Sequence, residues 1–320
     1  MKVSTFFGIL LLATVPSVVM GTAMKSEPAI PVHPLEGMEH EVYYAAPRPL
    51  TEGFDGEVAV IMIHGWGSGV TVPHEQLVLQ NTLDEAYVLS PMYPRAQILE
   101  KYGVERGERA VWNDSWPKDL TIPGSPDDDW RGGGDAAGTE LSSFDVVDTL
   151  LSRLSDRRLY PNLKKIALVG FSAGGQFVGR YVASGKGRVR DGIILRYVAM
   201  SPSTYLIPDP DDVWHYGLKN RPRYSADLTE SQIMDNLHTR RCMHGCGSAD
   251  TLEKSLDKTV SAMKQGENRY RRFLNFRTIV SKDSLWNAST TFHTFDSVGH
   301  AAVTAYADPF FVDYVMNQSF

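Results

Sequence analysis

A glycine-rich segment from Gly170 to Gly175, with the sequence GFSAGG, constrains the fold of this chain more than any other feature. It follows the apolar run 166–169 and precedes an apolar helical pattern, so we interpret it as a sharp turn between a strand and a helix. Such a turn strains the backbone at Ser172, and side chains two positions away would clash, which favours Gly170 and Gly174. The turn lifts the Ser172 hydroxyl above the sheet edge, where it can act as a nucleophile. An ordinary glycine-rich turn is the alternative.

Apolar strands and helical patterns alternate along most of the chain, which predicts an α/β fold with a mostly parallel sheet and helices on both faces. The expected strands are 40–45, 58–63, 86–90, 165–169, 195–200, 240–246 and 292–298, and the expected helices include 142–154, 252–263 and 301–316. We expect one domain over 38–320 after an extended lead-in, 24–37. Two stretches interrupt the alternation: the long loop 93–140, and the insertion 202–238, which we expect to form a small cap over Ser172.

A serine hydroxyl needs a base to take its proton, and histidine is suited to this because its usual pKa lies near neutrality. His300 is the candidate base among nine histidines, since it follows the last expected strand and lies at the same sheet edge as Ser172. His244 falls inside an expected strand and is better explained as a core residue.

An acid that orients the histidine should lie between serine and histidine in the chain, at another strand end. Asp250 meets this condition because it follows the strand 240–246 and precedes an expected helix. Its alternative role is to cap that helix. The rivals lack a clear strand end before them; they are Asp283, Asp209, Asp211 and Asp212.

The sequence His64-Gly65-Trp66-Gly67 closes the strand 58–63. Glycines there allow backbone N–H groups to approach a developing oxyanion, and we expect the N–H groups of Trp66 and Ala173 to form this oxyanion hole. An ordinary strand-ending turn is the alternative for Gly65 and Gly67.

Aromatic residues in the two long insertions are candidates for a substrate pocket. Trp112 lies in the long loop, and Tyr205 and Trp214 lie in the insertion 202–238. Packing of the loop tryptophans, which also include Trp116 and Trp130, onto their own domain would bury the same aromatic area, so the two interpretations stay open.

Taken together, these motifs resemble the α/β-hydrolase superfamily over roughly residues 38 to 318. The strings SAGGQFV from Ser172 and SPSTY from Ser201 resemble a little-characterised microbial clade of predicted hydrolases, although Phe171 stands where that clade usually has histidine. The resemblance implies an eight-stranded sheet with the triad at its carboxyl edge. It supplies no substrate.

The start of the chain is typical of a signal peptide. Lys2 is followed by an apolar stretch, and small residues around Ala23 fit a cleavage site, so we predict cleavage after residues 1–23 and secretion. An uncleaved anchor is the alternative, but the stretch is short of the roughly 20 apolar residues that span a bilayer. Sequons at Asn113, Asn287 and Asn317 would permit N-glycosylation.

Charge and composition argue against several other classes of protein. The net charge of −6 without a basic face disfavours nucleic-acid binding. Asp127-Asp128-Asp129 lacks the spacing of a calcium loop and is expected to be a solvated face, so we predict no metal and no cofactor. Cys242 and Cys246, about 13 Å apart in an extended strand, are expected to be buried thiols unless a turn at Gly245 brings them together.

The function expected from these residues is hydrolysis of a carboxylic ester, such as a small-molecule or lipid-like ester, through a Ser-His-Asp triad and an acyl-enzyme. Amidase or peptidase chemistry would use the same triad. A secreted binding protein on the same fold is the non-catalytic alternative.

Overall fold

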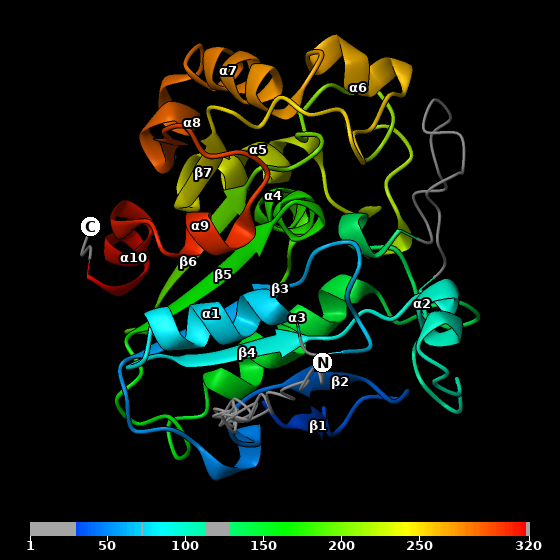
Figure 1. The fold of residues 1–320 in the computed structure, drawn as a ribbon, viewed down its shortest axis with the longest axis vertical. Helices are drawn as coiled ribbons and strands as arrows, with labels where there is room; N and C mark the ends of the chain where they lie inside the picture. Colours follow the sequence, from blue (N-terminus) through cyan, green and yellow to red (C-terminus); the bar gives the residue numbers. More distant parts are fainter. Residues whose placement is uncertain (1–29, 72, 113–128, 318–320) are drawn as a thin grey trace, which may run out of the picture.

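A mostly parallel, eight-stranded sheet forms the centre of the molecule (Figure 1). The computed structural model of the chain describes residues 30–71, 73–112 and 129–317. The strand order is β1-β2-β4-β3-β5-β6-β7-β8, in which neighbours from β4 to β8 are parallel and the pairs β1–β2 and β2–β4 are antiparallel. The predicted fold class is confirmed.

The strands are β1 Val32–Pro34, β2 Tyr43–Ala45, β3 Val58–Ile63, β4 Tyr87–Pro91, β5 Lys165–Phe171, β6 Ile194–Met200, β7 Cys242–Gly247 and β8 Thr290–Phe295. The α-helices are α1 His74–Thr82, α2 Ala96–Lys101, α3 Ser143–Leu154, α4 Ala173–Ser184, α5 Glu230–Thr239, α6 Val260–Gln265, α7 Arg269–Val280, α8 Ser284–Ser289, α9 Ala302–Tyr306 and α10 Pro309–Met316. Short 3-10 helices are η1 Leu50–Glu52, η2 Trp130–Gly132 and η3 Arg223–Ser225.

Helices cover both faces of the sheet, and β3 shows why the central strands are apolar throughout. Its residues Val58, Val60 and Met62 pack in the core beneath α1, α9 and α10, while the alternate residues pack in the core beneath α3, α4, α5, α7 and α8. Successive side chains of a strand point to opposite faces, so a strand covered on both sides needs an apolar residue at every position.

The predicted helix 252–263 is wrong over most of its length, because α6 begins only at Val260. Before it, the Asp257 carboxylate accepts hydrogen bonds from the Thr259 N–H (2.9 Å) and from the Tyr216 hydroxyl (2.7 Å). Side chains that bond the backbone in this way compete with helical hydrogen bonds. Thr259 then caps α6 by accepting from the Ala262 N–H.

The predicted helix 301–316 consists of two helices, α9 and α10. The break comes at Asp308, whose carboxylate accepts from the N–H groups of Phe310 and Phe311, and Pro309 occupies the first turn of α10. Proline lacks an N–H group and cannot continue a preceding helix, but it fits the start of a new one.

The sheet starts earlier than the predicted Met38. Within the expected lead-in, Val32–Pro34 forms β1 and pairs with β2 in the register Val32 to Ala45. Residues 1–29, and with them the predicted signal peptide, lie outside the described residues.

Candidate active site

The turn after β5 has the strained geometry that its glycines predict. Ser172 has φ 58° and ψ −114°, a left-handed conformation that is unfavourable for a residue with a side chain, and its N–H donates to the Met200 carbonyl at 2.9 Å. A β-carbon added at Gly174 would overlap the Ile63 carbonyl, and one at Gly170 would overlap the backbone of Gly174. Both glycines therefore let the turn pack closely against β3 and α4.

The structure brings Ser172, His300 and Asp250 into hydrogen-bonding distance. His300 Nε2 lies 2.9 Å from Ser172 Oγ, and His300 Nδ1 lies 2.7 Å from Asp250 Oδ2. Because an ionised carboxylate can only accept, Nδ1 carries the proton, and Nε2 of the neutral ring is left to accept from the serine hydroxyl. The Asp250 side chain is 0% exposed and that of His300 is 27% exposed.

Two contacts around Asp250 were not foreseen from the sequence. Arg269, at the start of α7, places Nη1 3.8 Å from Asp250 Oδ1 and is itself buried. Its guanidinium also donates to the carbonyls of Leu252, Lys254 and Ser255. In addition, the Ala249 N–H donates to the Val298 carbonyl at 3.0 Å, which ties the loop carrying the acid to the loop carrying His300.

The loop after β3 is held by His64, which is 1% exposed. Its Nε2 accepts from the Tyr93 N–H at 3.1 Å, and its Nδ1 lies 2.8 Å from the Gly65 carbonyl oxygen. Burial lowers the pKa of His64 to about 4, so the ring is neutral at pH 7 and its single proton sits on Nδ1, donating to Gly65. In a trans peptide, the Gly65 C=O and the Trp66 N–H point in opposite directions. By holding the Gly65 carbonyl, His64 therefore also fixes the direction of the Trp66 N–H.

Two buried arginines hold the Trp66 side of the same loop. Arg95 Nη2 donates to the Trp66 carbonyl at 2.7 Å, and its guanidinium carbon lies 3.7 Å from the centre of the Trp66 ring. The guanidinium carbon of Arg131 lies 4.8 Å from the ring, and Arg131 pairs with Asp129 at 2.7 Å. No sequence motif pointed to Arg95 or Arg131, because stacking between distant loops leaves no local pattern.

Asp129 is a buried partner of Arg131 and not part of a solvated face, so that prediction is wrong. Burial would raise the pKa of Asp129, but Arg131 and His215 outweigh this and hold the pKa below its usual range. Asp127 and Asp128 lie outside the described residues. In the described ranges, no group of three His, Cys, Asp or Glu side chains could hold a metal ion.

A cavity of about 320 Å³ opens beside Ser172. Its walls come from the end of β3, the loop 65–68, α1, the serine turn and α9. The lining residues are Met62, Ile63, Gly65, Trp66, Gly67, Ser68, Glu75, Phe171, Ser172, His300, Ala302 and Tyr306. Phe171 also packs against the His300 ring, with ring centroids 4.8 Å apart. Ala173 is the first residue of α4, so its N–H has no acceptor within the helix.

The predicted pocket residues Trp112, Tyr205 and Trp214 do not line this cavity, and all three are buried in the core. Trp112 Nε1 donates to the Gly134 carbonyl at 3.0 Å, and Trp214 Nε1 donates to the Gly132 carbonyl at 2.9 Å. Tyr205 stacks on Phe276 at 4.3 Å between ring centroids. Trp116 lies outside the described residues.

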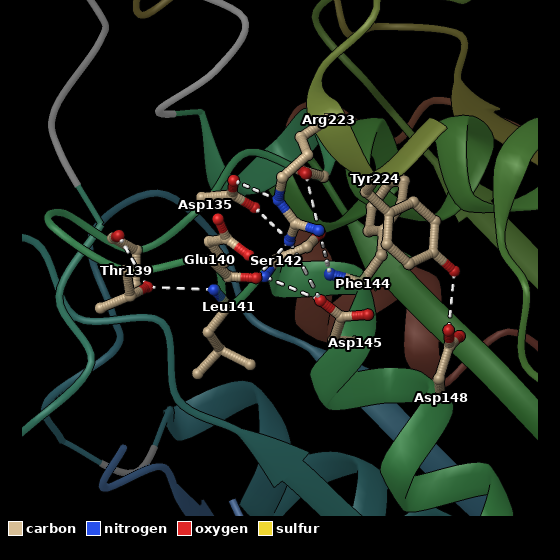
Figure 2. Close-up of polar contacts among 12 residues, drawn as sticks. Asp135, Thr139, Glu140, Leu141, Ser142, Phe144, Asp145, Asp148, Arg223 and Tyr224 are labelled. Atoms are coloured by element: carbon tan, nitrogen blue, oxygen red, sulfur yellow. Dashed lines mark hydrogen bonds and ion pairs between the residues drawn. The ribbon is translucent and has the colours of Figure 1, made fainter. Parts of the chain in front are cut away.

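Among the described lining residues of the cavity, none comes from the insertion 202–238. Figure 2 shows its anchor: Arg223 is bound to Asp135 at 2.8 Å and approaches Asp145 at 3.7 Å, and the Tyr224 hydroxyl donates to Asp148 at 2.8 Å. These contacts hold the insertion on the loop before α3 and on α3 itself, beside α4. The expectation of a cap over Ser172 is therefore not met.

Three other histidines and the two cysteines take structural positions. His244 is buried in β7, where burial lowers its pKa to about 3, and His238 and His293 pair with Asp283 and Asp308. Cys242 and Cys246 are free and buried, as expected of two residues in one strand.

Solved structures of known proteins share this architecture. A poly(aspartic acid) hydrolase-1 from Sphingomonas sp. KT-1 is 20% identical with a TM-score of 0.63, over 90% of this chain and 99% of that one. The chain has the α/β-hydrolase fold. The LpqC poly(3-hydroxybutyrate) depolymerase from Bordetella parapertussis shares it with 16% identity and a TM-score of 0.61, over 87% of each chain. No protein-family model and no curated protein matches the chain. In the described part of this α/β-hydrolase-fold chain, no helix is long and apolar enough to cross a membrane.

Proposed function

We propose that this protein is a serine hydrolase that cleaves carboxylic esters. The observation that carries the proposal is the chain of two hydrogen bonds from the buried Asp250 carboxylate through His300 to the Ser172 hydroxyl. A serine placed on a strained turn, with a neutral imidazole nitrogen 2.9 Å from its oxygen, is equipped to attack a carbonyl carbon.

In the proposed reaction, Ser172 Oγ attacks the ester carbonyl carbon while His300 Nε2 takes the hydroxyl proton. The oxyanion that forms accepts hydrogen bonds from the N–H groups of Trp66 and Ala173. The intermediate collapses when His300 returns the proton to the leaving alcohol, and an acyl-enzyme remains. Water then attacks this ester with His300 again as base, which releases the acid and regenerates Ser172.

Amide hydrolysis by the same triad is the alternative activity, and the names of the two similar structures favour testing both activities. One is a poly(aspartic acid) hydrolase, named for a polyamide, and the other a poly(3-hydroxybutyrate) depolymerase, named for a polyester. We favour the ester because an alkoxide leaves more readily than an amine. Matched p-nitrophenyl esters and p-nitroanilides of graded acyl length would rank the two activities.

A fluorophosphonate probe tests the proposal directly, because it labels only an activated serine. Wild-type protein should be labelled at Ser172 and should hydrolyse a p-nitrophenyl ester, whereas Ser172→Ala should do neither. Ser143→Ala is a matched control, since Ser143 is a buried serine at the start of α3 that donates to the Trp130 carbonyl. Folded wild-type protein that is neither labelled nor active would instead favour a binding protein on this fold.

We also propose that the protein is secreted after cleavage of residues 1–23. The support is the charged, apolar and small-residue sequence before Met24. Among the sequons, Asn287 is exposed on α8 and Asn317 is exposed after α10, which leaves both open to glycosylation. N-terminal sequencing of material from the medium should begin near Met24, and Met1 there would contradict the proposal.

A further inference from the structure

Glu75 is the acidic side chain of the cavity beside Ser172. It lies in the first turn of α1 and is half-buried. Among the described lining residues none is lysine or arginine, so no permanently charged cation offsets the Glu75 carboxylate. The cavity therefore carries a net negative charge close to the reacting serine.

The Glu75 carboxylate has no hydrogen-bond or ion-pair partner in the described part of the chain. The proposed reaction also gives it no role. An acidic residue in the first turn stabilises a helix by a few tenths of a kcal/mol, but this requires no contact with a cavity.

Tyr306 supplies a second, independent sign of a ligand at this place. Its side chain comes from α9 and is only 1% exposed, yet its hydroxyl has no hydrogen-bond partner among the described residues. Tyr306 lines the same cavity as Glu75 and Ser172, so its hydroxyl is available to a molecule bound there. Burial, and after it the charge of Glu75, raises the pKa of Tyr306.

The other side chains that shape the cavity include the apolar residues Met62, Phe171 and Ala302, but polar groups make up the larger share of the exposed wall. A substrate that fills it must therefore present some apolar surface together with a group that suits a carboxylate, a phenol oxygen and an aromatic ring. A cationic nitrogen meets these requirements, because it is attracted by the carboxylate and can contact a tyrosine ring or oxygen. A carboxylate-bearing substrate would be repelled by Glu75.

We propose that Glu75 is a specificity-determining residue that selects esters carrying a cationic nitrogen near the scissile bond, with Tyr306 completing the subsite. This inference rests on the proposed ester hydrolysis at Ser172.

Two substrates of the same shape and different charge test the inference. Acetylthiocholine carries a quaternary nitrogen, and in its neutral dimethylbutyl analogue a carbon replaces that nitrogen. We expect wild-type protein to have the higher kcat/KM for the cationic thioester. Glu75→Gln should lower the cationic-to-neutral ratio about tenfold, and added salt should reduce the wild-type ratio because it screens a half-buried charge.

Glu85→Gln is the matched control, because it removes the same charge from an exposed residue outside the cavity. Its ratio should equal that of wild type. Equal ratios for wild type and Glu75→Gln, or a wild-type preference for the neutral thioester, would overturn the inference. Hydrolysis of p-nitrophenyl acetate separates the two proposals: if it persists, ester hydrolysis stands without the charge preference, and if wild type hydrolyses no ester, both proposals fail.

Discussion

Replacing Arg95 by methionine tests how the loop that carries the Trp66 N–H is held for catalysis. Methionine keeps the apolar length of the side chain but removes the donor to the Trp66 carbonyl, now 2.7 Å away, and the charge 3.7 Å from the Trp66 ring. A hydrogen bond from a charged group is worth about 1.5–3 kcal/mol, so the loop after β3 should become less rigid.

The expected loss of kcat in Arg95→Met depends on which contacts still hold the loop. Losing one oxyanion donor altogether lowers kcat roughly 10²–10³-fold. In Arg95→Met the Gly65–Trp66 peptide, which carries the Trp66 N–H, is still held by His64, which donates to the Gly65 carbonyl at 2.8 Å. We therefore expect a smaller loss, about tenfold to a hundredfold in kcat, with KM changed little because the donor acts mainly in the transition state.

Steady-state kinetics with a p-nitrophenyl ester, together with thermal melting, would measure both effects. Arg95→Lys should recover part of kcat, since an ammonium group can donate to the same carbonyl. Affinity for a boronic acid that mimics the tetrahedral intermediate should fall in parallel with kcat. A well-folded Arg95→Met protein with wild-type kcat, or one in which only KM rises, would refute the reasoning.

Three further predictions concern the triad, the insertion and acid stability. Ser172→Ala, His300→Ala and the double variant should fall to similar residual rates, on the order of 10³-fold below wild type. The losses of rate do not add, because the two side chains act as one unit. A further large loss in the double variant would contradict this. Trp214→Ala should cost about 3–5 kcal/mol of stability in urea unfolding yet leave the ranking of ester chain lengths unchanged, because Trp214 packs in the core. Burial lowers the pKa of His64 to about 4 and of His244 to about 3, from 6.5. The pKa of each histidine is lower in the folded protein than in the unfolded chain, so its full contribution to the free energy of unfolding is present above pH 6.5. This contribution is lost as pH falls below 6.5, by about 1.4 kcal/mol per pH unit for each histidine. His244→Gln should flatten melting temperature against pH between pH 6.5 and 4, and an unchanged slope would count against a neutral, buried His244.

The sequence alone predicted the parts of this protein that depend on local patterns. The serine turn is readable because a strained strand-to-helix junction needs small residues around Ser172. The positions of Asp250 and His300 are readable because strand ends in a parallel sheet meet at one edge, so residues far apart in the chain can be expected near each other.

Only the tertiary structure determined which side chains contact residues of the site such as Asp250 and Trp66. Arg269 behind Asp250 and Arg95 on Trp66 come from segments whose local sequence carries no sign of the contact. The aromatic residues of the insertion 202–238 could have been buried over the serine or against α4, and contacts such as that of Arg223 with Asp135 accompany the second arrangement. Burial of apolar surface is not directional, so periodicity can indicate that a side chain is buried, but only the packed molecule determines where.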